Sequence, residues 1–380
     1  MPQEQSRDIQ LTSDNVLAWR MRRQYLDRAA EVDTALVVRR LCGLQAQVPS
    51  AAERAVAARQ PVPRPGAVAP ALADRRLVKT WAMRGTLHLL TVADAPAYLS
   101  LLAAARSWEK GSWQRTFVTT AQLDAIAEAA AKALDGRVLT REQLTAEIVD
   151  RTGDRTLGAH LGSGWGTVLK PLAWQGLLVN GPSEGGRVTF TRPDTWLDGW
   201  PALPAPEVAA QTVIPSYLGA YGPATPEVFD QWLLRGATKK ATLKGWFAGL
   251  VADGTLVRVE VDGQPAYARA TDVDAIVDAE PFDGVRLLPA FDHYVLGPGT
   301  SDTRVIPAGR RGAVSRAAGW ISPVVVHRGR VVGTWDIEGD ALDVMLFTES
   351  GPVPTDRIEV EGARLGAYAG IDLRLTIRTD

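Results

Sequence analysis

The chain has 380 residues, of which 46% are hydrophobic and 22% are charged. This composition is typical of a globular protein and excludes a fibrous or largely disordered chain. The 42 Lys and Arg residues nearly balance the 43 Asp and Glu residues, so the net charge of -1 gives no general preference for nucleic acid. At roughly 150 residues per domain, the length predicts two or three folded units.

The charge is distributed unevenly along the chain. Residues 1–120 carry 17 basic and 10 acidic side chains, a local charge of +7, whereas residues 201–280 carry 6 basic and 10 acidic side chains, a local charge of -4. Residues 303–335 contain six arginines and no acidic residue. The basic stretches are candidates to face a polyanion, although an unevenly charged solvated surface explains them equally well.

The sequence offers few residues for a metal site or a disulfide. Cys42 is the single cysteine, which excludes an internal disulfide and a zinc site built on several thiolates. The four histidines are scattered and form no paired-ligand motif, so we expect no metal. The N-terminus lacks the apolar core of a signal peptide, and no apolar stretch is long enough to span a bilayer. We therefore expect a soluble cytoplasmic protein.

The first predicted elements are two helices and a β-hairpin. The Thr-Ser-Asp run at residues 12–14 offers N-cap oxygens to a first helix, and a second helix is predicted over residues 34–44. Because a glycine and a proline flank the peptide Gln45-Ala46-Gln47, this peptide is predicted to be a helix end or an extended turn. Residues 78–81 and 86–90 are then predicted to be two strands joined by a turn.

The same order of helices followed by a hairpin recurs twice. In the second copy, Thr140 and Gln143 predict a capping box at a helix N-terminus, and in the third copy Thr225 and Pro226 open a helix. The other elements of these copies are a helix over 164–175 with strands over 177–179 and 188–190, and a helix over 242–252 with strands over 256–261 and 266–268. Three such units in one chain are typical of tandem winged-helix domains.

The last hundred residues are rich in predicted strands. These lie over 285–288, 324–326 and 331–335, and a helix over 356–368 and a strand over 373–377 follow them. Residues 201–206 and 272–281 are predicted to be linkers. The sequence thus predicts an α+β protein with one winged-helix motif in each of residues 1–118, 119–206 and 207–280, and a β-rich C-terminal domain with a basic hairpin over residues 281–380.

Familiar catalytic signatures are mostly missing from the sequence. It contains no phosphate-binding P-loop and no nucleophile elbow of a hydrolase. The least ordinary feature is the pair Gln45 and Gln47. In an extended backbone both amides project from one face and can hold one water molecule or one ligand oxygen. A helix end with solvated amides is the simpler explanation of this pair taken alone.

Four segments taken together resemble a known family. They are Leu44-Gln45-Ala46-Gln47, residues 79–88 from Lys79 to His88, residues 286–297 from Arg286 to Gly297, and residues 329–335 from Gly329 to Trp335. In that order and at those separations they are similar to the AlkZ- and YcaQ-like winged-helix DNA glycosylases of bacteria. The resemblance spans essentially the whole chain.

The resemblance implies a C-shaped protein with three tandem winged-helix motifs and a C-terminal β-barrel-like domain, which grips duplex DNA. Members of this family excise N7-alkylated guanines, including bulky natural-product adducts and interstrand cross-links, without a metal or an organic cofactor. Their catalytic element is a glutamine, an apolar residue, and then a glutamine or an aspartate. Gln45-Ala46-Gln47 matches the all-glutamine form of the AlkZ-like branch, which is associated with self-resistance to DNA-alkylating antibiotics. Gln45 and Gln47 are thereby implied as the catalytic residues.

The implied chemistry suits a pair of amides. An N7-alkylated guanine is cationic and leaves without a strong general acid, and the transition state resembles an oxocarbenium ion. A glutamine cannot deprotonate water at neutral pH, but its carbonyl can orient a water molecule and place negative dipole near the developing charge. The second glutamine of the motif, Gln47, supplies no carboxylate. Either the labile substrate reacts without one, or an acidic residue from elsewhere in the fold contributes.

Basic side chains are the candidates for contact with DNA. The hairpin at residues 328–330 is the candidate for a probe of the minor groove or for phosphate contacts. Lys79 and Arg84 are candidates to anchor the DNA backbone, although surface charge on a wing explains them equally well. For Asp292 and His293 we favour a structural role; the alternative is that they orient groups in the cleft. The full set of candidates for DNA contact is Lys79, Arg84, Arg304, Arg310, Arg311, Arg316, Arg328 and Arg330.

The expected partner is double-stranded DNA that carries an alkylated guanine. The protein is expected to be a monomer that uses no cofactor and does not associate with a membrane. Two alternatives stay open at this point. The first is a non-catalytic winged-helix regulator, and the second is a resistance protein that sequesters the drug or its adduct. A protein of either kind should bind without releasing a base, and should keep its affinity when Gln45 and Gln47 are replaced by alanine.

Overall fold

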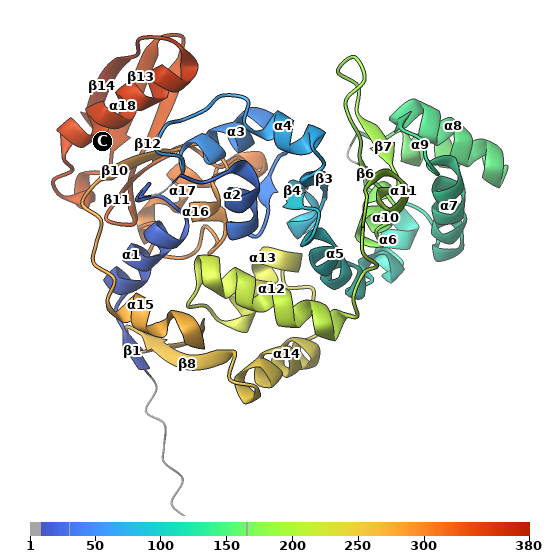
Figure 1. The fold of residues 1–380 in the computed structure, drawn as a ribbon, viewed down its shortest axis with the longest axis horizontal. Helices are drawn as coiled ribbons and strands as arrows, with labels where there is room; N and C mark the ends of the chain where they lie inside the picture. The colour runs from blue at the N-terminus through green and yellow to red at the C-terminus, as the bar shows by residue number, and fades with distance from the viewer. Residues whose placement is uncertain (1–8, 30, 165) are drawn as a thin grey trace, which may run out of the picture. The chain divides into compact units, whose positions relative to one another are not determined.

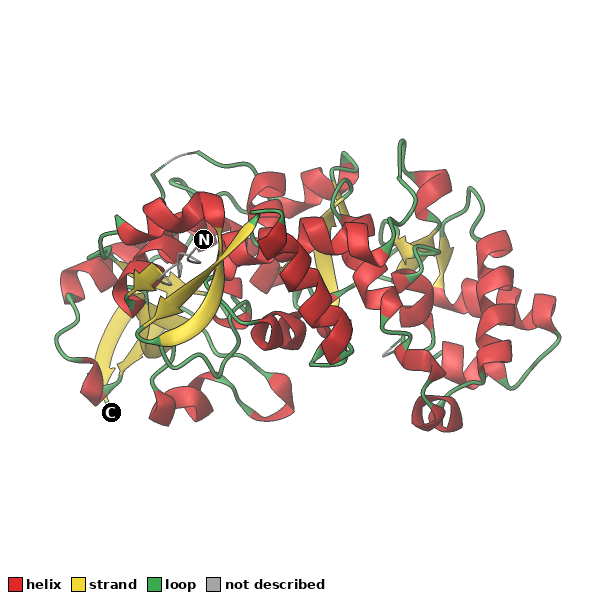
Figure 2. Ribbon diagram, turned by 90° about the horizontal axis from the view of Figure 1, so that it is seen from below, coloured by secondary structure: helices red, strands yellow, loops and turns green. Residues whose placement is uncertain are grey.

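The computed structural model describes residues 9–29, 31–164 and 166–380, which form a mixed α+β protein (Figure 1 and Figure 2). The chain folds into two compact units. The first unit comprises Met1–Val68, Ile214–Trp232 and Leu243–Asp380, and the second comprises Ala69–Val213 and Leu233–Thr242. Residues 1–118, predicted as one winged-helix motif, contribute to both units. The division into compact units does not decide the four predicted domains, which stay a prediction together with the count of three winged-helix motifs.

The N-terminal segment of the first unit contains two short strands and three helices. Thr12 caps the first helix as predicted, since its side chain accepts a hydrogen bond from the backbone N–H of Asn15. The second helix ends before residue 44, because Cys42 and Gly43 adopt positive φ angles of 55° and 100°. The elements are β1 (Ile9–Leu11), α1 (Ser13–Arg23), α2 (Thr34–Arg40), β2 (Leu44–Gln45) and α3 (Pro49–Ala57).

A small sheet joins this segment to the middle of the chain. The predicted hairpin is formed by β8 (Leu256–Val261) and β9 (Gln264–Arg269), which are antiparallel. The strand β1 pairs in parallel with β8, with Val259 opposite Ile9. No local pattern indicates this pairing, because β1 and β8 are separated by more than 200 residues.

Residues 272–281 are not a linker, contrary to the prediction. They contain α15 (Val273–Val277), and Val273 and Ile276 pack in the same hydrophobic cluster as Trp19 of α1. The side chain of Asn15 donates hydrogen bonds to the carbonyls of Val277 and Ala279. The segment therefore contains a short helix that packs on α1 through its buried apolar side chains, and Asp274 is the acidic residue that lies on α15.

Three helices lie over residues 206–252, before the predicted third hairpin. They are α12 (Pro206–Tyr221), α13 (Pro226–Leu234) and α14 (Lys240–Ala252). The predictions for the third copy are confirmed by α13 and α14, whereas α12 had no counterpart among the predicted elements. Tyr217 of α12 packs edge to face on Phe229 of α13, with ring centroids 5.3 Å apart. This aromatic cluster fixes the C-terminal end of α12, which is the end that reaches the candidate site.

The C-terminal part of the first unit contains an open five-stranded sheet (Figure 2). Its order is β10-β11-β12-β13-β14, and all pairs are antiparallel except β13 with β14. Since β10 and β14 are both edges of the described sheet, it is not a closed barrel. The strands are β10 (Val285–Leu288), β11 (Val324–His327), β12 (Arg330–Glu338), β13 (Ala341–Leu346) and β14 (Arg374–Thr379).

Alternating residues of these strands supply two different cores, as the period of a β-strand requires. Leu288 and Val324 belong to the cluster that contains Leu17 of α1 and residues of α16 (His293–Leu296) and α17 (Arg311–Val314). Leu287 and Val325 belong to the cluster that contains Ile358 of α18 (Thr355–Ala369). Each face of the sheet is thus covered by helices of the same compact unit.

The second unit is mainly helical around a sheet whose described order is β4-β3-β6-β7-β5. Its strands are β3 (Leu77–Trp81), β4 (Leu87–Thr91), β5 (Leu139–Thr140), β6 (Val179–Asn180) and β7 (Thr189–Thr191). Its helices are α4 (Val68–Ala73), α5 (Ala95–Ala104), α6 (Gly111–Thr116), α7 (Thr120–Ala133), α8 (Arg141–Thr152), α9 (Leu157–Leu161), α10 (Leu169–Trp174) and α11 (Pro193–Trp196). The predicted strand pairs at residues 78–90 and 177–190 are confirmed.

The helix predicted over residues 164–175 begins only at Leu169, and residue 165 lies outside the described residues. Gly166 has a φ of +60°, and a Cβ at this position would lie 2.3 Å from the ring of Trp81. The backbone therefore passes directly against Trp81 in a left-handed conformation, which delays the start of the helix.

The capping box of α8 can be tested by substitution. The hydroxyl of Thr140 accepts from the backbone N–H of Gln143, and the Gln143 side chain accepts from the backbone N–H of Thr140. Replacing Thr140 by alanine leaves a helix N–H without its cap, so we expect Thr140→Ala to lower the free energy of unfolding by about 1 kcal/mol. Thr140→Ser keeps the hydroxyl and should lose less than half as much in urea unfolding. Equal losses for the two variants would contradict the capping role.

Candidate active site

The peptide that carries the two candidate glutamines leaves α2 through a left-handed turn. The backbone N–H of Gly43 donates to the carbonyl of Val38, which closes the helix. Leu44 and Ala46 are buried, whereas Gln45 is partly exposed and Gln47 is exposed. This alternation belongs to extended backbone, and it puts the two glutamines on the face opposite Leu44 and Ala46. The peptide is therefore extended at Gln45, which is one of the two predicted forms.

The Gln45 side chain has an uncommon environment. Its amide oxygen, Oε1, is buried, and within residues 9–29, 31–164 and 166–380 it has no hydrogen-bond partner. A buried polar atom of this kind costs free energy unless a water molecule or a ligand satisfies it. The backbone of the same residue is firmly held, since its N–H donates to Nε2 of His293 at 2.8 Å. The backbone of Gln45 is thus fixed, while its side-chain Oε1, which has no partner among the described residues, can accept a hydrogen bond from a ligand.

The contacts of His293 define its protonation state. Because Nε2 accepts from the Gln45 N–H, Nε2 carries no proton and the ring proton lies on Nδ1. The atom Nδ1 lies 3.2 Å from the hydroxyl of Tyr221, and this hydroxyl donates to the carbonyl of Leu41 at 2.6 Å. Burial raises the pKa of Tyr221, so the hydroxyl stays protonated as a donor. The Nδ1–H of His293 therefore donates to the Tyr221 oxygen.

This chain of hydrogen bonds holds the peptide at two points. Leu41 precedes the left-handed turn and Gln45 follows it, and both backbones are tied to the Tyr221–His293 pair. Gly297 allows Tyr221 to approach, because a Cβ at Gly297 would lie 2.1 Å from the Tyr221 ring. Sequence reasoning missed Tyr221, since α12 was not predicted; a Tyr at the end of a helix carries no signal of such a contact.

A buried ion pair secures the other side of the same region. Arg59 and Asp292 are both fully buried, and the guanidinium donates from Nη1 and Nη2 to the two carboxylate oxygens at 2.8 Å each. Arg59 also donates to the carbonyl of Ala55 near the end of α3, and Asp292 accepts from the N–H of Tyr294. The adjacent residues Asp292 and His293 therefore hold the segments on both sides of the glutamines, which is a positioning role.

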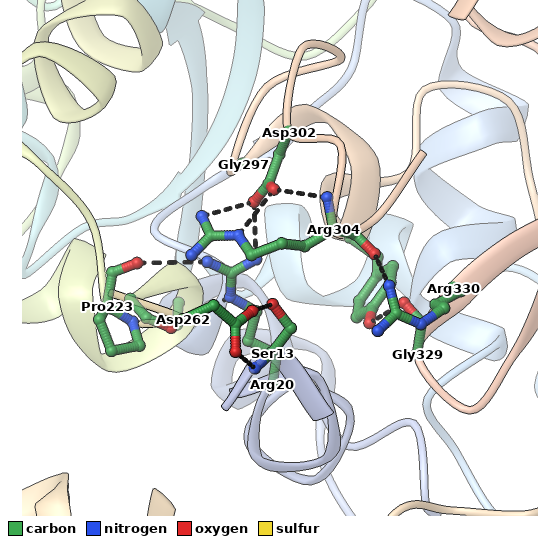
Figure 3. A network of polar contacts seen from close by, with 12 residues as sticks. Ser13, Arg20, Pro223, Asp262, Gly297, Asp302, Arg304, Gly329 and Arg330 are labelled. Atoms are coloured by element: carbon green, nitrogen blue, oxygen red, sulfur yellow. Dashed lines mark hydrogen bonds and ion pairs between the residues drawn. The ribbon is translucent and has the colours of Figure 1, made fainter. Parts of the chain in front are cut away.

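Arg304 and Arg330 belong to a polar network around Asp302 (Figure 3). The carboxylate accepts from Nε of Arg304 at 2.9 Å and from Nη1 of the buried Arg20 at 3.1 Å. Burial alone would raise the pKa of Asp302, but the two guanidinium groups outweigh burial and lower this pKa to about 2. Arg330 donates to the carbonyl of Arg304 at 3.1 Å and pairs with Asp14. Both arginines thus have structural partners within the first unit.

Arg310 is also engaged inside the chain. It donates to both oxygens of the Glu349 carboxylate at 2.5 Å and also binds Asp380, and these hydrogen bonds raise the pKa of Arg310. Two carboxylates therefore already face this guanidinium, which leaves it little net positive charge to offer a polyanion.

The three other arginines of the same stretch outside the Asp302 network are exposed. They are Arg311, Arg316 and Arg328. The guanidinium of Arg328 lies 3.3 Å from the carboxylate of Asp283, and both side chains are more than half exposed. An exposed ion pair of this kind contributes little and exchanges readily for another anion.

The turn between β11 and β12 is packed against the protein. Gly329 is buried, and a Cβ there would lie 2.6 Å from the Cβ of Leu17 in α1. Its carbonyl accepts from the hydroxyl of Tyr294 at 2.6 Å. The backbone of this turn thus lies on α1 at Gly329, and its contact with a groove or with phosphates stays a prediction. The side chains of Arg328 and Arg330 remain accessible.

Lys79 and Arg84 belong to the second unit. Lys79 lies on β3 opposite Leu89 and Asn180, where partial burial lowers its pKa. Arg84 occupies the turn between β3 and β4 with a φ of 57°. These two candidates therefore differ from the arginines of residues 303–335 in both unit and environment.

The described residues contain no group of three or more His, Cys, Asp or Glu side chains able to hold a metal ion. Over the same stretches of the chain, no helix is long and apolar enough to cross a membrane.

The hydrogen bond from Gln45 to His293 predicts a difference between two substitutions. A glutamine at position 293 can place its amide oxygen near the former Nε2, whereas an asparagine reaches only the former Nδ1. We expect His293→Asn to lower the free energy of unfolding by about 1–3 kcal/mol and to speed hydrogen exchange in residues 41–48, because the Gln45 N–H loses its acceptor. His293→Gln should keep exchange in this peptide close to that of the unaltered protein. The same exchange rate in both variants would show that the acceptor at Nε2 does not hold the peptide.

Comparison with known proteins identifies the family. A family model for AlkZ-like DNA glycosylases matches residues 38–368. The chain is 47% identical over 365 residues to the interstrand DNA cross-link repair glycosylase of Streptomyces sahachiroi, and the match covers 96% of this chain and 98% of that relative. The solved structure of Streptomyces sahachiroi DNA glycosylase AlkZ matches with a TM-score of 0.93 and 45% identity, over 97% of this chain and 100% of that chain. The predicted resemblance is confirmed, and the chain belongs to the AlkZ-like family of DNA glycosylases, hydrolases that act on N-glycosyl bonds.

Proposed function

We propose that this glycosylase releases N7-alkylated guanine from duplex DNA, including guanines joined in interstrand cross-links, in DNA repair or in self-resistance to a DNA-alkylating antibiotic. The observation that carries the proposal is the Gln45 amide, whose buried Oε1 has no protein partner among the described residues while its backbone is fixed by His293. The relative named for repair of interstrand DNA cross-links supports this class of substrate.

In the proposed reaction the two amides act on a water molecule. Oε1 of Gln45 and the side chain of Gln47 orient the water toward C1′ of the alkylated nucleotide and place negative dipole beside the positive charge that develops there. The bond from C1′ to N9 breaks with its electron pair going to the base, which leaves as a neutral N7-alkylguanine. The water oxygen bonds to C1′ and releases its proton to solvent, so the product is an abasic site.

No strong general base is needed in this proposal. His293 is engaged through Nε2 with the Gln45 N–H, and the Asp292 carboxylate is bound by Arg59 and the Tyr294 N–H. Neither group is therefore free to take a proton from the water. The positive charge of an N7-alkylated base weakens its glycosidic bond before the enzyme acts, so positioning and electrostatics carry the step.

The expected contacts with DNA follow from the charges that remain available. We propose that the exposed Arg311, Arg316 and Arg328 contact phosphates, because Arg304 and Arg310 already have internal partners. Arg330 stays a candidate, since its ion pair with Asp14 is exposed and exchanges readily for another anion. Lys79 and Arg84 stay candidates for contacts from the second unit. A monomer with three winged-helix motifs in a C-shaped arrangement around the duplex remains the expected form of the complex.

Base release from a defined lesion tests the proposed function. Purified protein is incubated with a duplex that contains one N7-methylguanine, and abasic sites are revealed by alkaline strand cleavage. We expect Gln45→Leu, which keeps the size of the side chain but removes its dipole, to slow single-turnover excision about 100-fold, as loss of one preorganised polar group does at other active sites. Gln45→Ala/Gln47→Ala should abolish measurable cleavage while DNA affinity stays within about twofold.

The matched control is Gln211→Leu, which alters an exposed glutamine on α12 and should leave the excision rate unchanged. Tight binding without base release from methylated or cross-linked DNA would refute the glycosylase proposal for this substrate class. That result would favour sequestration of the lesion or a regulatory role instead.

A further inference from the structure

A cavity of about 310 Å³ adjoins the glutamine peptide within the first unit. We name it the adduct pocket. Its wall includes Val48, which directly follows Gln47, and Ser50 and Ala51 in the first turn of α3. Since consecutive Cα atoms are about 3.8 Å apart, the pocket begins at the backbone that directly follows Gln47. The aromatic residue Trp320 and the charged residues Arg54, Arg316, Arg378, Asp336 and Asp343 also line it.

Trp320 is the distinctive side chain of this pocket. It is 45% exposed, although the indole ring is large and apolar. Its ring contacts Phe291 in an edge-to-face arrangement, with centroids 4.9 Å apart and an interplanar angle of 77°. The contact fixes the plane of the indole ring while almost half of the residue surface stays open. A Trp held in this way offers a flat apolar surface to a ligand.

The backbone that presents Trp320 is unfavourable in itself. Ala318 and Phe291 have φ angles of 57° and 59°, which residues with a side chain rarely adopt. The turn is closed by a hydrogen bond from the Arg316 N–H to the Trp320 carbonyl at 2.8 Å. Two positive-φ residues other than glycine therefore occur on the two sides of the same ring contact. Backbone strain of this kind clusters at ligand-binding sites, where the surrounding structure compensates for its cost in free energy.

The charges that line the adduct pocket nearly cancel. Asp336 and Asp343 are directly opposite each other on β12 and β13, and both line the pocket. Arg378 lies 3.7 Å from Asp343, and Arg54 and Arg316 are the other two basic lining residues. With three guanidinium groups and two carboxylates in its wall, the cavity carries a small net charge and suits an uncharged organic group.

We propose that the adduct pocket receives the planar aromatic part of a bulky group attached to N7 of guanine, stacked on Trp320. This inference rests on the proposed function, because it assumes that the guanine itself lies at Gln45 and Gln47. The N7 substituent is covalently joined to the base, so it must extend into space next to the catalytic peptide. The adduct pocket is such a space, and its volume is much larger than a methyl group needs.

The test compares two lesions in the same duplex, N7-methylguanine and N7-benzylguanine. Trp320→Ala should lower the single-turnover excision rate at subsaturating enzyme about tenfold for the benzyl lesion and less than about twofold for the methyl lesion. Trp320→Phe retains an aromatic face and should recover most of the benzyl activity. Val360→Ala, which truncates another exposed apolar side chain outside the pocket, serves as the matched control and should change neither rate.

Equal losses on both lesions would overturn the proposal, since they would assign Trp320 to the DNA backbone or to support of the glutamine peptide. Unchanged rates on both would overturn it as well. The dissociation constants of the two duplexes are measured in parallel. If the unaltered protein releases neither base, a preference for the benzyl duplex that Trp320→Ala removes would support the pocket while refuting the proposed function. Without such a preference, the pocket assignment fails too.

Discussion

Arg59 and Asp292 pair through two hydrogen bonds at a place that excludes water, and the geometry of the active site depends on this contact. Removal of one partner from a fully buried ion pair costs about 3–5 kcal/mol, because the other charge is left without compensation. The pair ties the end of α3 to the residue before His293. With Asp292 fixed, His293 is held where Nε2 meets the Gln45 N–H. The position of the proposed catalytic amide is thus set by residues more than 200 positions away in sequence.

This arrangement suits a reaction in which the protein supplies geometry and little acid or base strength. The titratable groups that hold the glutamine segment and its flanks are already engaged: His293 as a neutral acceptor, Asp292 with Arg59, and Tyr221 as a donor to Leu41. A site of this kind is useful only if the substrate brings its own reactivity, as a cationic alkylated base does. Within residues 41–48 of the described structure, the buried Oε1 of Gln45 has no hydrogen-bond partner, and we propose that a water molecule or the ligand satisfies it.

Sequence patterns predicted the elements whose causes are local. The caps at Thr12 and Thr140, the hairpin at residues 256–269 and the extended peptide at Gln45 follow from side chains and turns within a few residues. Contacts between distant segments were not predictable in this way. They include the parallel pairing of β1 with β8 and the helix in residues 272–281, which were predicted to be a linker although their apolar side chains pack on α1. The expected barrel was wrong for the same reason, since closure depends on pairing that no single strand specifies.

The arginines of residues 303–335 show why a count of charges gives an incomplete account of DNA binding. All six are equivalent in such a count, but Arg304 and Arg310 are held by Asp302, Glu349 and Asp380, acids that lie outside this stretch of the sequence. Charge that is neutralised inside the fold releases no counterions from DNA and so adds little to affinity. The contribution to DNA binding then depends on where the remaining accessible arginines lie. Arg316 lines the adduct pocket, so in the complex that we propose its charge lies close to the lesion.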